Sequence, residues 1–434
     1  MVKEKEELEV KVEHSDEAYE YAFEAVPMDK RKGKFSLFLV LAGYSVTLSN
    51  FMTGAAIGYN MTFSNAVIAA LIADAFLIGV VILTGIMSYN TGLSTSFLSR
   101  QAFGAKGSTL FSIILVISPI TWIGINGDSL AKMLSTNFPS WPIPTGITAV
   151  LLIMIWSISA SRGYKGLEFI SYFGVPAALI LTVASAIKVF SLPDSMSTIL
   201  AYIPDETMTF TSATASMIGS WIFGCCITPD VCRFGRTRKD VLIGSIAAFV
   251  IGLFGLQFCG IIVATYSGQP DFIAGTAAIG IGLLVTICSI VTLMTTQDNN
   301  VYAASLALQN IFRETKLYGK VKHKWIAVSV SACAAILGYS GALKYFLPIV
   351  KALGVFIGPI PGLLIAEYYF VKKSKASKDL NIIAIISWFG GALAGYISLR
   401  NNFFISAVIG LFVTMILYVI LSKLFDDTLN KDIK

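Results

Sequence analysis

The stretch Gly219–Arg236, GSWIFGCCITPDVCRFGR, interrupts an apolar run that is long enough to enter a membrane. Two of its glycines lie five residues apart, and Pro229 lacks the amide hydrogen that a continuous helix needs. Lipid offers no partner to freed backbone groups, so a break at membrane depth is tolerated only where those groups line a polar cavity. The stretch therefore predicts a broken helix with Trp221 and Phe223 beside a substrate. The alternative is a packing kink without a break.

A second apolar run carries a similar interruption, Ser49–Gly58, which reads SNFMTGAAIG. Two interrupted helices in corresponding halves of a chain indicate a transporter binding site. The glycines Gly54 and Gly58 also have the small-xxx-small spacing of closely packed membrane helices. The sequence leaves open whether these glycines serve a packing contact or helix unwinding.

The composition indicates a protein that crosses a membrane many times. Of its 434 residues, 55% are hydrophobic and only 13% are charged, which excludes a soluble domain of this size. The basic residues lie in short loops between apolar spans, so the net charge of +6 does not indicate nucleic-acid binding. The six cysteines lack metal-type spacing and are interpreted as reduced packing residues. With only two histidines, both in charged segments, we expect neither a histidine-ligated metal nor a hydrolase, and no enzyme activity.

Twelve apolar spans are expected, each near the ~20 residues needed to cross the hydrocarbon layer. They lie at roughly 36–61, 65–87, 109–131, 146–161, 168–190, 209–228, 241–266, 277–308, 325–337, 342–370, 380–399 and 404–423. We expect the chain to divide into a polar tail over 1–34, a first five-helix repeat over 35–190, an external loop over 191–208, a second repeat over 209–372, and two additional helices with a polar tail over 373–434.

The loops predict the orientation, because Lys and Arg concentrate in alternate connections and mark the cytoplasmic face. Such connections include Arg233–Lys239 and Lys372–Lys378. An even number of spans places both termini on the same face. We therefore expect a multi-pass protein of the plasma (inner) membrane with both termini in the cytoplasm.

Trp122 and Asn126 lie four residues apart in the third span and so share one face of a helix. One offers an aromatic plane, and the other offers an amide with a donor and an acceptor. This combination suits a planar heterocycle. The alternative is a packing tryptophan beside an asparagine that makes a hydrogen bond between helices.

The eighth span places Thr292, Thr295 and Thr296 on one face, followed by Gln297, Asp298 and Asn299. Hard small cations take oxygen ligands of this kind, and carbonyls of an unwound helix can complete the shell. The alternative is that the threonines bond their own helix backbone. No acidic residue is clearly placed at the centre of the first or eighth span, which favours sodium over protons as the coupling ion. Asp74 and Asp298 are the acids that would titrate in the proton alternative.

Four stretches of the chain resemble the nucleobase:cation symporter-1 family, which holds cytosine, purine, allantoin and hydantoin permeases. They read KGKFSLFLVLAGYSV (Lys32–Val46), SRQAFGAKGS (Ser99–Ser108), DVCRFGR (Asp230–Arg236) and TTQDNNVYAAS (Thr295–Ser305). Their order and spacing are similar to those of cytosine permeases from residue 32 to about residue 372. The resemblance implies an all-α polytopic membrane protein with the leucine-transporter-type five-plus-five inverted repeat, in which helices 1 and 6 are broken.

The resemblance also implies two sets of site residues. An aromatic sandwich and the hydrogen-bonding groups around it are implied at Trp122, Trp221, Asn126, Ser220 and Gln297. Sodium ligands are implied at the backbone oxygens of Gly43, Val46 and Thr292 and at the hydroxyls of Thr295 and Thr296. Cytosine permeases have glutamine at Pro119, phenylalanine at Trp221 and serine at Phe223, so the pocket is expected to differ from theirs.

We therefore expect a symporter that imports a nucleobase-like planar heterocycle such as cytosine, a purine, hydantoin or allantoin by alternating access. Sodium is the expected coupling ion, with no other cofactor, no nucleic-acid partner and no required oligomer. The alternatives are a proton-coupled member of the family and an amino-acid carrier of the same fold. An amino-acid site needs free helix ends for carboxylate and amine, whereas a base site needs two opposed rings.

Overall fold

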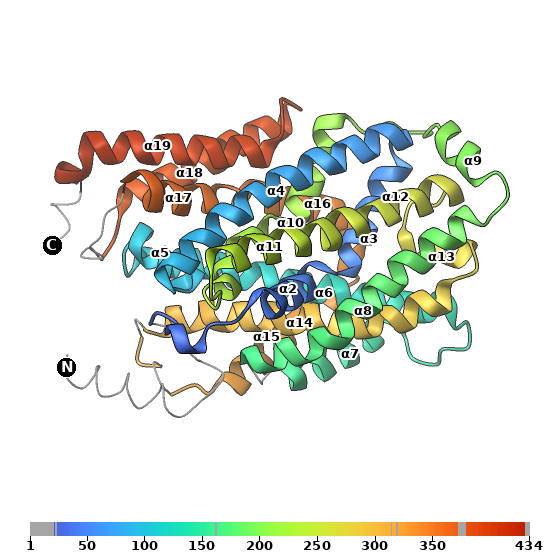
Figure 1. Ribbon diagram of the computed structural model, residues 1–434, viewed down its shortest axis with the longest axis horizontal. Coiled ribbons are helices and arrows are strands. Elements are labelled where there is room, and N and C mark those ends of the chain that lie inside the picture. The colour runs from blue at the N-terminus through green and yellow to red at the C-terminus, as the bar shows by residue number, and fades with distance from the viewer. Residues whose placement is uncertain are drawn as a thin grey trace.

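The computed structural model is an elongated bundle of helices that run mostly along its long axis (Figure 1). It describes residue 21 and residues 24–160, 163–313, 315–317, 320–371 and 379–429. Most of the predicted tail over 1–34 and all of the predicted Lys372–Lys378 loop lie outside the described residues. Within these ranges the elements are helical, apart from one isolated bridge between Lys32 and Gly235.

Among the described residues, eight spans are long and apolar enough to cross a membrane. They are α4 (Phe63–Thr91), α6 (Gly107–Asn137), α8 (Gly163–Phe190), α10 (Phe210–Cys232), α11 (Arg238–Phe249) continued by η3 (Val250–Gly255) and α12 (Leu256–Ser267), η4 (Ala342–Tyr345) continued by α16 (Phe346–Ile357), α17 (Pro359–Ala366) and η5 (Glu367–Val371), α18 (Ile382–Arg400), and α19 (Ser406–Leu429). A ninth is the bent pair α2 (Lys34–Ser45) and α3 (Leu48–Tyr59). Three further helices, α7 (Thr145–Ala160), α14 (Gly282–Arg313) and α15 (His323–Tyr339), occupy the remaining positions of the twelve predicted spans.

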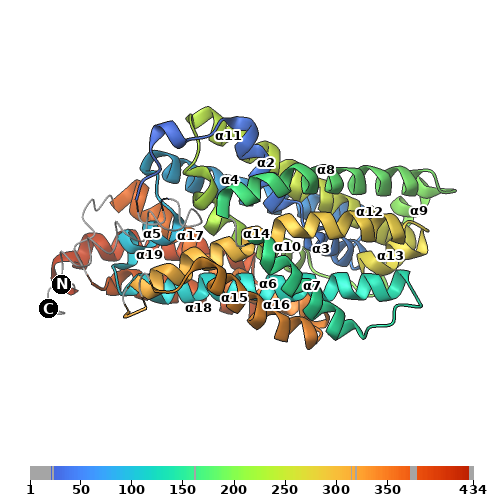
Figure 2. The ribbon, with the colours of Figure 1, turned by 90° about the horizontal axis from the view of Figure 1, so that it is seen from below.

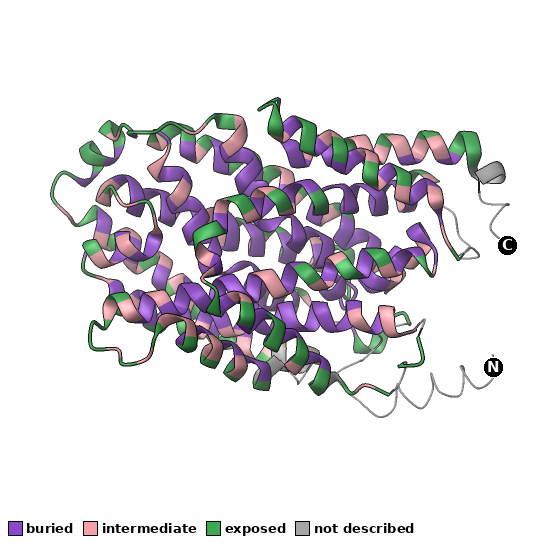
Figure 3. Cartoon of the chain, turned by 180° about the vertical axis from the view of Figure 1, so that it is seen from behind, coloured by how far each residue is buried: buried purple, intermediate pink, exposed green. Residues whose placement is uncertain are grey.

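Short helices mark the two ends of the bundle. The first, α5 (Thr95–Phe103), lies at one end, and α9 (Ser195–Ala201) and α13 (Phe272–Ala278) lie at the other, in both side views (Figures 1 and 2). Buried residues fill the middle of the bundle, whereas exposed residues line its outer helices (Figure 3). The most apolar window of α10 is 83% buried, and that of α19 is only 28% buried. The α10 helix is therefore central, and α19 presents an apolar surface to the lipid.

The first span is broken, as predicted. Its two helices, α2 and α3, meet at an angle of 53°. The Asn50 side chain spans the break, because its Nδ2 donates to the carbonyl of Ser45 at 2.6 Å and to that of Gly252 at 2.8 Å. A carbonyl at the end of α2 therefore keeps a partner although its helix stops.

The sixth span is one continuous helix, α10, so the predicted break in it is not found. The two glycines allow close packing instead: a Cβ at Gly219 would lie 2.1 Å from the Val350 carbonyl oxygen, and one at Gly224 would lie 1.8 Å from the Trp221 ring. Pro229 leaves the carbonyl of Cys225 without its usual helical donor. The Thr84 hydroxyl on α4 donates to that carbonyl at 3.2 Å, so the helix continues through the proline.

The glycines of α3 also serve packing. A Cβ at Gly54 would lie 2.0 Å from the carbonyl oxygen of Gln257 on α12, and one at Gly58 would lie 2.9 Å from the backbone of Ile261. In return, a Cβ at Gly260 would lie 2.1 Å from the carbonyl oxygen of Phe51. Small residues on both helices let the two backbones touch. Of the two roles that the sequence left open for these glycines, the structure supports the packing contact.

Candidate substrate and cation sites

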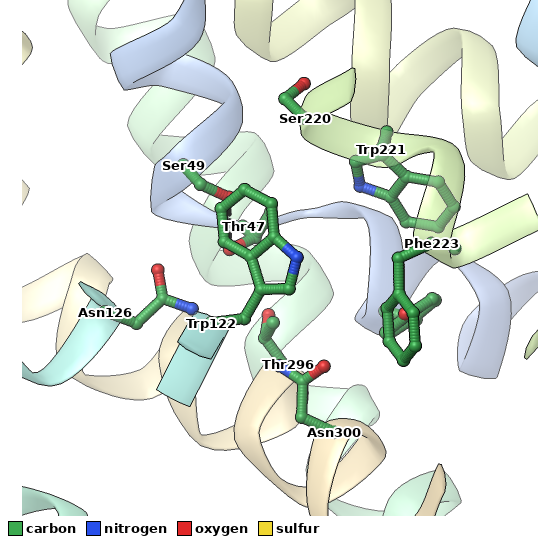
Figure 4. Close-up of a pocket in the computed structure, with 11 residues that line it drawn as sticks. Thr47, Ser49, Trp122, Asn126, Ser220, Trp221, Phe223, Thr296 and Asn300 are labelled. Carbon is green, nitrogen blue, oxygen red and sulfur yellow. Dashed lines mark hydrogen bonds between the residues drawn. The ribbon is translucent and has the colours of Figure 1, made fainter. Parts of the chain in front are cut away.

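A small cavity lies where the break between α2 and α3 faces α6, α10 and α14 (Figure 4). Its free space of about 20 Å³ has room for about one water molecule, so binding of a heterocycle requires the lining side chains to move apart. Five of the six predicted substrate residues line it: Trp122, Asn126, Ser220, Trp221 and Phe223. The sequence reasoning missed several others that also line it, among them Tyr44, Thr47, Ser49 and Asn300.

The two tryptophans enter the cavity from opposite sides, Trp122 from α6 and Trp221 from α10 (Figure 4). The Trp221 ring is held edge-on between Tyr44, at a centroid distance of 4.9 Å, and Phe249, at 4.6 Å. The Trp122 ring is edge-on to Phe346 at 6.3 Å. Aromatic neighbours thus fix both rings at the wall of the cavity.

Asn126 supplies an unused donor and an unused acceptor at this cavity. Its side chain is 1% exposed, and neither its Oδ1 nor its Nδ2 has a hydrogen-bond partner within the described chain. Ser220, by contrast, donates to the carbonyl of Met217 on its own helix at 2.7 Å. Buried amides without partners are rare in folded proteins, and a ligand edge is one group that would satisfy them. The Asn126 amide is therefore the main polar feature of the cavity.

Gln297 does not line the cavity, although the resemblance implied that it contacts the substrate. Its side chain is fully buried, and both amide atoms lack a hydrogen-bond partner among the described residues. Asn300 takes the lining position on α14 together with Thr296. Residues four apart share a helix face, so the spacing from Thr296 to Asn300 was the signal in the sequence that identifies Asn300.

The five predicted sodium ligands come together at the break in the first span. The Thr295 hydroxyl lies 2.7 Å from the carbonyl oxygen of Gly43 and 2.7 Å from that of Thr292. The Thr296 hydroxyl lies 3.4 Å from the carbonyl oxygen of Val46. These are uncharged oxygen donors from an interrupted helix and from a helix that packs against it. Such a set suits a hard small cation, which would replace the hydroxyl-to-carbonyl bonds.

A depression opens toward the α9 end of the bundle, lined by residues of α3, α6, α13 and α16. Charged side chains surround it, and Lys132 and Asp271 form an ion pair there at 2.7 Å. Phe346 lines the depression and also contacts the Trp122 ring. The Phe346 ring therefore lies between the depression and the central cavity.

Backbone hydrogen bonds cross the α5 end of the bundle. The segment before α2 is tied to the loop after α10, because the Lys32 amide donates to the Phe234 carbonyl at 2.5 Å and the Arg236 amide donates to the Lys32 carbonyl at 2.8 Å. The buried Arg233 guanidinium donates to the Tyr302 hydroxyl of α14 at 3.0 Å. This contact joins the DVCRFGR and TTQDNNVYAAS stretches directly.

Comparison with known proteins places this arrangement among permeases. Residues 25–384 match the protein family described as permease for cytosine/purines, uracil, thiamine, allantoin. The cytosine permease of Escherichia coli K12 is 26% identical over 383 residues, which cover 86% of this chain and 87% of that protein. The allantoin permease of Bacillus subtilis is 21% identical, with 81% of this chain and 82% of that protein covered.

Among solved structures, the chain is similar to the nucleobase-cation-symport-1 family transporter Mhp1 in a closed conformation with bromovinylhydantoin bound. The TM-score is 0.75 at 15% identity, and the match covers 93% of this chain and 96% of that one. This likeness shows that the chain has the leucine-transporter-type fold. Since the family match covers most of the chain and its relatives are permeases rather than enzymes, the chain belongs to the nucleobase:cation symporter-1 family of membrane permeases.

Proposed function

We propose that the protein is a sodium-coupled importer of a nucleobase-like planar heterocycle such as cytosine, a purine, hydantoin or allantoin. The observation that carries this proposal is the cavity between Trp122 and Trp221 with the unpartnered Asn126 amide at its edge. Two rings can stack on a flat ligand from both sides. The amide can then select among heterocycles by the donors and acceptors on their edges.

Sodium is the proposed coupling ion because the Thr295 and Thr296 hydroxyls lie close to carbonyls at the break. The same broken helix lines the cavity through Tyr44 and Thr47, so an ion at the break and a substrate in the cavity would order the same backbone. Each would then strengthen the binding of the other, because coupling free energy is reciprocal.

The protein is proposed to lie in the plasma (inner) membrane with its α5 end and both termini in the cytoplasm. The exposed basic loop Arg236–Lys239 at this end supports the assignment. The α5 end is tied by backbone hydrogen bonds, and the depression opens at the α9 end, which fits an outward-facing stage of alternating access. We also propose the division into repeats over 35–190 and 209–372.

Uptake into proteoliposomes tests the proposal. The purified protein is given a panel of labelled cytosine, purines, hydantoin and allantoin, with an inward sodium gradient, with equal sodium on both sides, and with a pH gradient alone. We expect uptake of one class, driven by the sodium gradient. Uptake that is independent of sodium but driven by the pH gradient would favour the proton-coupled alternative. Uptake of amino acids instead of heterocycles would favour the amino-acid carrier.

Selectivity gives a second test with a matched pair of variants. Asn126→Leu removes an amide that lines the cavity, and Gln297→Leu removes a buried amide that does not. We expect Asn126→Leu to change the order of preference among the panel, because a site built to bond a polar edge rejects ligands that leave it unpaired. Gln297→Leu should preserve that order, and the reverse result would move the polar contact to Gln297.

A further inference from the structure

A second polar cluster is buried beside the broken first span and does not line the cavity. It consists of Asp74 on α4, Gln257 at the start of α12 and Asn50 in the first turn of α3. Their side chains are 3%, 0% and 0% exposed, respectively. Asp74 lies eleven residues after the first residue of the 29-residue helix α4, which is about 17 Å along the axis at 1.5 Å per residue. The carboxyl group is therefore deep in the bilayer.

The hydrogen-bonding capacity of this cluster is largely unused. Both carboxyl oxygens of Asp74, both amide atoms of Gln257 and the Oδ1 of Asn50 have no hydrogen-bond partner within the described chain. The Gln257 amide is the polar neighbour of the Asp74 carboxyl, although the two do not reach hydrogen-bond geometry. A buried carboxyl group beside a buried amide, neither with a hydrogen-bond partner among the described residues, is difficult to explain as packing alone.

No cation among the described residues interacts with the Asp74 carboxyl group. On the described helices packed against α4, the other titratable groups are Tyr59, Cys225, Cys226, Asp230, Cys232, Arg238, Lys239, Asp240, Cys259, Tyr266, Glu367, Tyr368 and Tyr369. Of these, Cys225 is the one that interacts with Asp74, and its thiol is directed to the carbonyl of Leu77 at 3.6 Å. An ionised carboxylate here would be a buried charge without a counter-ion, which is costly in the bilayer.

A neutral carboxyl group fits its neighbour better. It offers one O–H donor and one carbonyl acceptor, and a primary amide offers the complementary acceptor and donors. Asp74 and Gln257 can therefore form two parallel hydrogen bonds only while Asp74 carries a proton. Loss of that proton leaves an anion that must be paired or hydrated, and this requires the helices around it to move.

Packing contacts and hydrogen bonds join the cluster to the break. Gln257 follows the π-helical turn η3, and its carbonyl touches Gly54 of α3. A Cβ at Gly252 in that turn would lie 1.9 Å from the Ser45 hydroxyl. Asn50 ties Ser45 to Gly252 by two hydrogen bonds. Single π-helical turns occur frequently at functional sites. A displacement of Gln257 can therefore displace the end of α2 through these contacts.

We propose that Asp74, facing Gln257, is a proton-binding site separate from the candidate sodium site. In the proton-bound form, hydrogen bonds between Asp74 and Gln257 join α4 to α12 and so stabilise the break. Release of the proton loosens this contact, so the proton regulates the movement of the first span in the transport cycle. The proton-binding part stands on the geometry alone, and the regulatory part rests on the proposed function.

Infrared spectroscopy of the purified protein in lipid nanodiscs tests the site without substrate or sodium. We expect a carbonyl band of a protonated carboxylic acid near neutral pH that disappears as the pH is raised. Asp74→Asn should abolish this band, and Gln257→Leu should shift its frequency, because the hydrogen-bond partner is lost. Asp194→Asn, at an exposed loop residue, is the matched control and should keep the band. A band that is absent from the unmodified protein, or that persists in Asp74→Asn, would overturn the site.

Transport tests the regulatory part. At saturating sodium, the initial uptake rate of the unmodified protein should fall as the pH rises through the infrared transition, because the deprotonated form loosens the contact. Asp74→Asn cannot ionise and can still pair with Gln257, so its rate should not change across that range. If Asp74→Asn keeps the pH dependence of the unmodified protein, the regulatory role is overturned.

Two further outcomes keep the tests separate. If Asp74→Asn does not fold, Gln257→Leu replaces it, and its carboxylic-acid band should shift in frequency because the hydrogen-bond partner is lost; an unshifted band would overturn the pairing. If no member of the substrate panel is taken up, the proposed function fails, while the infrared result still decides the proton site.

Discussion

The first and sixth spans hold corresponding places in a fold of this type, and only the first is broken. Both contain glycines and polar residues inside an apolar run. The first bends by 53° between α2 and α3, whereas α10 continues from Phe210 to Cys232. The difference lies in what the neighbouring helices offer. At the first span, side chains of Asn50, Thr295 and Thr296 approach the carbonyls that the break frees.

The sixth span meets neighbours that favour continuity. The Val350 carbonyl of α16 lies beside Gly219, the ring of Trp221 on α10 itself lies beside Gly224, and the Thr84 hydroxyl of α4 substitutes for the donor that Pro229 lacks. Glycine and proline in an apolar run therefore indicate a helix of low intrinsic stability. Whether it breaks depends on which partners the rest of the bundle provides for its backbone.

The largest expected effect is at Gly54, where α3 touches α12. In Gly54→Leu, the new side chain would collide with the Gln257 backbone, and backbone cannot move aside as a side chain can. Overpacking of this kind costs about 3 kcal/mol or more. We expect little folded protein in size-exclusion profiles and a strongly lowered Tm. Gly79→Leu is the matched control, because a Cβ at Gly79 meets no atom within 4 Å. Equal yields for the two variants would contradict the close contact between α3 and α12.

The next effect concerns the ring that α10 holds at the cavity. Stacking of a base on an aromatic side chain contributes about 1 to 3 kcal/mol. Trp221→Ala should therefore weaken binding of the transported heterocycle by roughly ten- to hundredfold, as measured by scintillation proximity with purified protein. Trp122→Ala should behave similarly, and Trp325→Ala, at an exposed ring, should not. Unchanged affinity in both cavity variants, with folding intact, would exclude the aromatic sandwich.

A smaller effect is expected at the break in the first span. The double variant Thr295→Ala with Thr296→Ala removes two hydroxyls that approach the carbonyls of Gly43 and Val46. Loss of an ion site coupled to the substrate should lower substrate affinity in saturating sodium by about 1 kcal/mol, the lower end of typical coupling energies. Binding should also become independent of sodium concentration. Thr292→Ser, which keeps its backbone carbonyl, is the control and should remain sodium-dependent. Sodium-dependent binding in the double variant would place the ion elsewhere.

The smallest effect tests why α10 does not break. Thr84→Val leaves the Cys225 carbonyl without the donor that it receives across the helices. The expected loss of stability is about 1 kcal/mol, the typical worth of one hydrogen bond. In a Pro229→Ala background the helix supplies its own donor, so the same Thr84 change should cost less. A double-mutant cycle on thermal unfolding measures the coupling. A zero coupling energy would show that Thr84 does not compensate for the proline.

The sequence predicts the parts of this protein that depend on local composition. Apolar stretches of sufficient length identified the spans, and the spacing of Trp122 and Asn126 correctly placed both on one face. It could not predict continuity in α10, because the Thr84 donor comes from a helix more than a hundred residues earlier. The sequence reasoning also assigned Gln297 to the substrate site, whereas Asn300 lines the cavity. A difference of a few residues turns a helical side chain to another face of the helix.

The polarity of α14 has a consequence for how the protein enters the membrane. This helix is 32 residues long, yet it is absent from the spans that are apolar enough to cross a membrane alone, and its polar run from Thr292 to Asn300 is buried. The insertion machinery selects segments by their transfer free energy, and such a run inserts poorly by itself. It packs against α6 and α8, which are synthesised earlier. The residues proposed to bind sodium therefore make insertion of α14 depend on helices that are already in the bilayer.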